Sequence, residues 1–216
     1  MDVGWLTKGG VVMVPLLGFS LVAVALILER MIFWVKIARR QDRLAREVLA
    51  MYSHNPRNAF LKLERNTDLP IARIFLAALE LDRPNPEEFR LALESSAQAE
   101  MPLLKRFNTM FETIISLSPL LGLLGTVLGL IRSFASLKLG EMGGSSTLGV
   151  SAGISEALIS TAAGLVVAIF TLLFANTFRG LYLRQIALIQ EYGGQLELLY
   201  RRYYEQGVPQ SYAATG

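Results

Sequence analysis

The sequence contains no cysteine and only one histidine, His54. Without cysteine there can be no disulfide bond, thiolate metal site or cysteine nucleophile. A lone histidine argues against a metal site of several imidazoles and against a serine–histidine triad. There is also no Walker A loop, dinucleotide-binding fingerprint or paired set of metal ligands. We therefore predict a protein that is not an enzyme and uses no cofactor and no metal.

Charged residues are scarce as well. They make up 18% of the 216 residues, whereas hydrophobic residues make up 52%. Soluble domains carry about 25% charged residues, so this composition argues against a soluble protein. The charges gather in residues 30–113, which hold 14 Lys or Arg and 11 Asp or Glu. Such a mixed-charge region is typical of a solvated surface rather than of a basic stripe that binds nucleic acid.

The sequence contains three long runs of uncharged, mostly apolar residues. The first runs from Val11 to Leu28, the second begins at Ile114, and the third runs from Ala157 to Ala175. A helix of about 20 apolar residues crosses the hydrocarbon core of a bilayer. The sequence therefore predicts an all-α membrane protein with three transmembrane helices and long cytoplasmic helical extensions.

The basic residues predict the orientation of these spans. Residues 1–10 carry one basic residue and the segment 132–156 carries two, whereas four follow residue 176 and 14 lie in 30–113. Basic residues stay on the cytoplasmic side of a membrane. The predicted order is a periplasmic N-terminus (1–10), a first span (11–34), a cytoplasmic region (35–113), a second span (114–134), a periplasmic loop (135–153), a third span (154–176) and a cytoplasmic C-terminal helix and tail (177–216).

The predicted cytoplasmic parts have helical patterns. In RPNPEEF, Asn85 can cap a helix whose first turn holds Pro86 and two glutamates. We expect this helix to continue into the second span, with a kink at Pro102. After the third span an amphipathic helix follows, weakened at Gly193–Gly194, and the final GVPQSYAATG is expected to fray.

Small residues follow one face of the second span. Gly122, Thr126 and Gly129 recur at helical spacing, and Gly125 forms a GxxxG pair with Gly129. Small residues let membrane helices approach closely, so this face is expected to meet another helix, as is Gly164 of the third span. Packing alone is one interpretation of the glycines and a functional role is the other, and the Thr126 hydroxyl has a further role only if it faces a pore.

The third span begins with a carboxylate, Glu156. Glu156, Ser160 and Gly164 share a face, whereas Thr161 lies about 140° around the helix from Glu156. An ionisable residue beside a span is costly unless protein or water surrounds it, which makes Glu156 a functional candidate. A simple position among the outer headgroups is the alternative.

Two stretches carry a resemblance to a known family. SPLLGLLGTVLGLIRSF (118–134) and GISEALISTAAGLVVAIFTLLFANTF (153–178) resemble the paired signatures of the MotA/TolQ/ExbB proton-channel family. Three spans resemble its ExbB/TolQ branch rather than its four-span members. By motif match, the resemblance places Glu156, Thr126 and Thr161 in the proton pathway or pore.

The resemblance also implies a function and partners. It implies a motor or stator subunit of the bacterial inner membrane that is driven by the proton-motive force. Such proteins form homo-oligomers, expected here to be pentamers, around two copies of a single-span ExbD- or TolR-like protein. They pass work to a TonB- or TolA-like protein. An ExbB-like role in outer-membrane uptake leads, and a TolQ-like role in envelope maintenance, a gliding-type motor and a non-conducting membrane scaffold are the alternatives.

Overall fold

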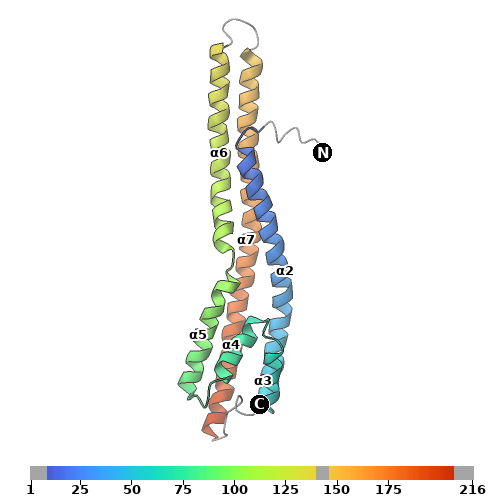
Figure 1. The fold of residues 1–216 in the computed structure, drawn as a ribbon, viewed down its shortest axis with the longest axis vertical. Helices are drawn as coiled ribbons and strands as arrows, with labels where there is room; N and C mark the ends of the chain where they lie inside the picture. Colours follow the sequence, from blue (N-terminus) through green and yellow to red (C-terminus); the bar gives the residue numbers. More distant parts are fainter. Residues whose placement is uncertain (1–8, 140–145, 207–216) are drawn as a thin grey trace. The chain divides into compact units, whose positions relative to one another are not determined.

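A computed structural model describes residues 9–139 and 146–206, and within these ranges all of the regular secondary structure is helical (Figure 1). Three of its helical segments are long and apolar enough to cross a membrane, which confirms the predicted all-α architecture with three membrane-length helices. The frayed C-terminus predicted above and most of residues 1–10 lie outside the described residues. The helices are α2 (Met13–Tyr52), α3 (Pro56–Glu64), α4 (Pro70–Leu79), α5 (Pro86–Leu104), α6 (Asn108–Leu139) and α7 (Ser146–Glu205).

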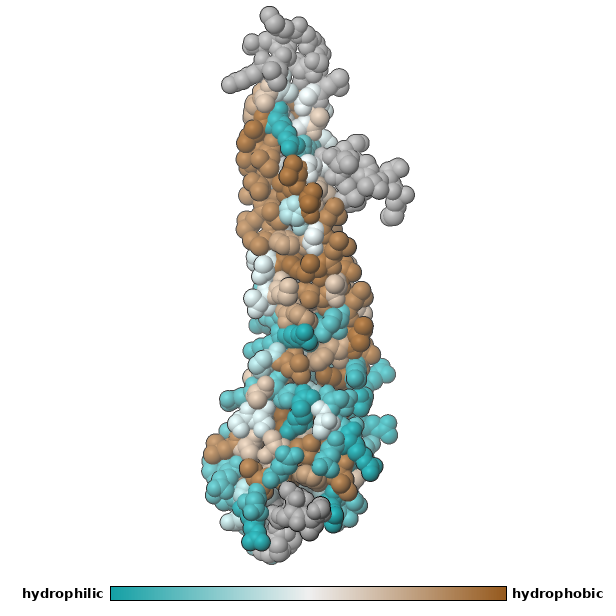
Figure 2. All heavy atoms as spheres, in the orientation of Figure 1, coloured by the Kyte–Doolittle hydropathy of each residue, from teal (hydrophilic) through white to brown (hydrophobic). Residues whose placement is uncertain are grey.

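Internal contacts divide the chain into two units. The apolar unit comprises Met1–Arg30 and Phe107–Thr177, and the polar unit comprises Met31–Arg106 and Phe178–Gly216. In Figure 2 hydrophobic residues dominate the visible surface of the apolar unit, and hydrophilic residues are frequent on that of the polar unit.

In the apolar unit the start of α2 runs beside α6 and α7 (Figure 1). Val12, just before α2, and Met13 and Leu16 of α2 are buried, and Leu121, Leu128 and Ala163 of the other two helices pack against them. Large side chains remain exposed around this small core, among them Leu21, Val166 and Ile169. Exposure of such an apolar surface is favourable in the hydrocarbon core of a bilayer and unfavourable in water.

The polar unit is held together by aromatic and ionic contacts. Phe89 of α5 stacks on Tyr200 of α7 with ring centroids 4.0 Å apart, and the Tyr200 hydroxyl donates to the Pro84 carbonyl at 2.6 Å. Arg73 of α4 donates two hydrogen bonds to the Glu100 carboxylate of α5. The ring contact thus joins helices that lie far apart in the sequence, and the ion pair joins two consecutive helices.

The start of α5 confirms the predicted cap. The Asn85 side chain accepts hydrogen bonds from the backbone N–H groups of Glu87 and Glu88, and the Glu88 carboxylate accepts one from the Asn85 N–H. This reciprocal capping box satisfies donors that a helix start otherwise leaves unpaired.

Helix continuity differs from the prediction at several points. The break before α6 does not occur at Pro102, which lies within α5, but at residues 105–107, where Phe107 adopts a positive φ of 67°. A left-handed residue ends a helix, because it turns the chain away from the helical path. At Gly193–Gly194, where weakening was expected, α7 continues without interruption.

The predicted loop at 135–153 is wrong in extent. Helix α6 continues to Leu139 and α7 already begins at Ser146. The small residues that suggested a loop instead allow helices to pack. A Cβ placed on Gly149 would lie 2.8 Å from the Ser136 Cβ.

Candidate functional site

Glu156 lies on α7 within the apolar unit, and its partner is a basic residue of α6. The Arg132 guanidinium donates to the Glu156 carboxylate and forms an ion pair with it. The side chain of Glu156 is 16% exposed, whereas that of Arg132 is 50% exposed. The arginine is therefore the accessible half of the pair and the carboxylate the covered half.

Sequence reasoning missed Arg132 as a site residue and treated it only as a charge that reports orientation. One signal was present, because Arg132 follows Gly129 by three residues and Gly125 by seven. That spacing places it at the edge of the helix face on which the small residues lie. Its long side chain reaches α7 from there.

A turn from the N-terminal side covers the same carboxylate. Gly10 adopts a positive φ of 73°, a conformation that favours glycine. A Cβ built on Gly10 would overlap Oε1 of Glu156, and one on Gly9 would lie 3.3 Å from Cγ2 of Ile159. Gly10 thus lets the chain pass directly over Glu156, and Gly9 lets it pass close to Met13 and Ile159.

Thr161 and Ser160 bind the facing helix instead. The Thr161 hydroxyl donates to the Gly122 carbonyl of α6 at 3.0 Å. The buried Ser160 hydroxyl donates to Ala157 of its own helix at 2.8 Å and lies 3.4 Å from the same Gly122 carbonyl. Ser160, for which the sequence suggested no purpose, therefore belongs to the contact between α6 and α7.

The glycines of the two spans lie where the helices approach most closely. A Cβ added to Gly122 would lie 3.0 Å from the Ser160 carbonyl oxygen, and a Cβ added to Gly129 would lie 2.6 Å from the Gly153 carbonyl oxygen. At Gly164 it would lie 2.5 Å from the Ser118 carbonyl oxygen. At Gly125 it would lie 2.5 Å from the Ser160 Cβ. A larger side chain at any of these positions would push α6 and α7 apart.

Thr126 has its hydrogen-bond partner within its own helix. Its hydroxyl donates to the Leu123 carbonyl of its own helix at 2.6 Å, and its side chain is partly exposed. Within one chain, Glu156 is paired with Arg132 and Thr161 with Gly122. Each of the three pathway residues therefore has a different hydrogen-bond partner in the described part of the chain.

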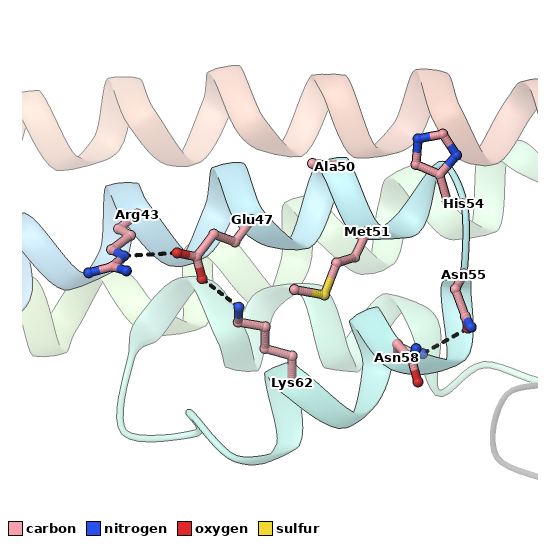
Figure 3. A pocket seen from close by; sticks show the side chains of 8 residues that line it. All are labelled: Arg43, Glu47, Ala50, Met51, His54, Asn55, Asn58 and Lys62. Carbon is pink, nitrogen blue, oxygen red and sulfur yellow. Dashed lines mark hydrogen bonds and ion pairs between the residues drawn. The ribbon is translucent and has the colours of Figure 1, made fainter.

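The polar unit holds a shallow pocket of about 570 Å³ between α2 and α3 (Figure 3). Glu47 lies in it, and hydrogen bonds from Lys62 and Arg43 lower the pKa of its carboxyl to about 2. The single carboxylate of the pocket is thus already paired with two cations, Lys62 and Arg43. His54 also lines the pocket. Among the described residues there is no group of three or more His, Asp or Glu side chains that could hold a metal ion.

Comparison with known proteins assigns a family. A Synechocystis sp. protein named as biopolymer transport protein ExbB-like 3 is 63% identical over 96% of this chain and 99% of its own length. A second protein of that organism, named ExbB-like 1, is 45% identical over 94% of this chain and 80% of its own length. The Tol-Pal system protein TolQ of Haemophilus influenzae is 36% identical over 49% of this chain and 44% of its own length. The model of the MotA/TolQ/ExbB proton channel family matches residues 66–191, and the chain belongs to this family.

Proposed function

We propose that this chain is an ExbB-like subunit of a motor driven by the proton-motive force. The observation that carries the proposal is the position of Glu156. It is a largely covered carboxylate on a membrane-length apolar helix, at the contact between α6 and α7. Ionisable groups in such places are costly and mark ion or proton pathways in membrane proteins.

The three pathway residues take different parts in this proposal. Glu156 attracts or relays protons near the outer end of the pathway. The Thr126 hydroxyl, which is bonded only within its own helix, is offered to a protonatable carboxyl of a partner helix. Thr161 fixes α7 against α6 through the Gly122 carbonyl and so sets the distance between the two helices that line the proposed pathway.

Assembly follows from the exposed apolar surface. The helices of the apolar unit expose many large side chains, which lipid and neighbouring subunits would cover. We propose five copies of this chain around two copies of a single-span, ExbD-like protein in the inner membrane. The N-terminus faces the periplasm and the C-terminus the cytoplasm, as the basic residues indicate. The motor energises a TonB-like protein for uptake across the outer membrane.

A TolQ-like role is the second candidate. The similarity to a Tol-Pal system protein over 107 residues favours it. The partner would then be TolR-like and the driven protein TolA-like, with the same use of Glu156.

The test replaces the carboxylate without changing its shape. Glu156→Gln, expressed with the partner, is expected to lower uptake that depends on the proton-motive force by at least about a hundredfold, the usual minimum for loss of a proton-transferring group. Glu112→Gln is the matched control, because Glu112 is an exposed carboxylate of the same unit.

The oligomer must be measured beside the activity. It is expected to persist in Glu156→Gln and in Glu156→Ala. Full activity of Glu156→Gln would leave the chain as a non-conducting scaffold. Loss of the oligomer would show that Glu156 holds the assembly together rather than carrying protons.

A further inference from the structure

Three separate parts of the chain converge on one carboxylate. Glu156 belongs to α7, its ionic partner Arg132 belongs to α6, and Gly10 lies in the turn before α2. All three lie in the apolar unit. No other described carboxylate of this unit is both ion-paired to a different helix and covered by a glycine turn.

We propose that Arg132 and the Gly9–Gly10 turn form an enclosure that positions the Glu156 carboxylate and withholds it from solvent. Arg132 is a positioning residue here, because it acts through Glu156. The inference rests on the proposed function only where it gives Glu156 a part in proton transfer. The enclosure itself can be measured without any activity.

The backbone next to the ion pair fixes its geometry. Gly129 of α6 and Gly153 of α7 approach so closely that a Cβ on either would lie 2.6 Å from the carbonyl oxygen of the other. The Ser133 hydroxyl also donates to the Val150 carbonyl at 3.2 Å. The two helices are thus clamped together beside Arg132 and Glu156, so the guanidinium meets the carboxylate across a fixed gap.

The exposed fractions of the two side chains determine which of them solvent and partner groups reach first. Because the guanidinium is half exposed and the carboxylate is not, solvent and partner groups reach Arg132 first. The carboxylate becomes accessible when Arg132 swings away or the glycine turn lifts. A partner helix that supplies a carboxylate for Arg132 would open the enclosure and release Glu156.

The test measures the chemical accessibility of Glu156. The probe is a water-soluble carbodiimide with glycinamide, applied to the purified complex, and the modified carboxyl groups are quantified by peptide mass spectrometry. Glu112, which is exposed, serves as the internal reference. In the unmodified protein Glu156 is expected to react more slowly than Glu112.

Substitution of either wall of the enclosure should raise that rate. Arg132→Gln is expected to speed labelling of Glu156 by about two- to fivefold, the range that corresponds to a partly exposed ion pair. Arg132→Lys keeps the charge and should restore most of the protection. Gly10→Ala should also speed labelling, because the methyl group displaces the turn from the carboxylate.

Two controls separate this effect from general loosening. Arg179→Gln makes the same chemical change at an exposed position of α7, and Gly18→Ala adds a methyl group where α2 has open space. Both should leave the labelling of Glu156 unchanged. An equal rate in Arg132→Gln and the unmodified protein would overturn the proposal. Full uptake activity of Glu156→Gln would instead overturn the proposed function and leave the labelling result standing.

Discussion

At the scale of single residues, Thr126 and Thr161 show that the same type of side chain can have different roles at two positions. The Thr161 hydroxyl bonds across to α6, whereas the Thr126 hydroxyl bonds back to its own helix. Removal of the first therefore breaks a tertiary contact, and removal of the second does not.

This difference gives a paired prediction. Thr161→Val should lower the free energy of unfolding by about 0.6 kcal/mol, the average for a hydrogen bond between membrane helices. Thr161→Ser should restore it. Thr126→Val should leave stability unchanged and still impair coupling. Thermal unfolding in detergent, together with proton-driven uptake, measures both effects.

Full coupling in Thr126→Val would remove that hydroxyl from the mechanism. Equal stability of Thr161→Val and the unmodified protein would show that the bond to Gly122 contributes nothing to folding.

Glu156 could be found from the sequence, but its surroundings could not. A carboxylate at the edge of an apolar run stands out because its desolvation is costly. Its partner Arg132 lies 24 residues away, and the covering Gly10 lies in another part of the chain. Local periodicity cannot identify such distant neighbours, because it describes only the faces of one helix.

At the scale of the helices, small residues determine how α6 and α7 pack. Lipid offers no hydrophobic drive for helices to associate, so close backbone contact must supply the attraction. Gly129 lies at one of the tightest points, where an added Cβ would also lie 2.9 Å from the Ala157 Cβ.

Gly129→Ala is therefore expected to destabilise the protein by about 1–3 kcal/mol, the usual cost of overpacking. The matched control is Gly180→Ala on α7, where nothing lies within 4 Å of the new methyl group. That change should stabilise the helix by about 0.5–1 kcal/mol, because alanine has the higher helix propensity. A lower melting temperature for Gly180→Ala than for Gly129→Ala would contradict this view of the interface.

Helix starts were easier to predict than helix ends. The capping box at Asn85 depends on residues within four positions, so the sequence contains the whole signal. The helical ends of α6 and α7 near residues 139 and 146 depend on tertiary contact between small residues such as Ser136 and Gly149. Composition favoured a loop there, and packing overrode it.

The contact between α2 and α7 in the polar unit predicts a dependence on pH. Burial, and then a hydrogen bond to Asp42, raises the pKa of Tyr192 to about 12, from an ordinary value of 10. Since the folded protein retains this proton more strongly, the stabilisation is complete below pH 10 and is lost as the pH rises toward 12.

Tyr192→Phe should flatten that loss, because phenylalanine has no proton to release. Urea unfolding from pH 9 to 12 measures the free energy of unfolding. The steeper decline is expected for the unmodified protein. The same slope in both proteins would show that another group titrates.

At the scale of the whole molecule, the proposed motor needs chains other than this one. Its apolar unit exposes large hydrophobic side chains along all three membrane-length helices. Glu156 is a covered carboxylate of that unit, and in the proposed motor a second protonatable group on a partner chain would turn proton entry into movement. The number of copies and the partner cannot be read from one sequence, because they depend on surfaces supplied by other chains.

Native mass spectrometry of the complex, purified after co-expression with the single-span partner, tests the central claim most directly. The account predicts five copies of this chain with two copies of the partner. A monomer or dimer that retains no partner would contradict the central-pore arrangement. Glu156 would then be an anchor in the headgroup region on the outer side of the inner membrane.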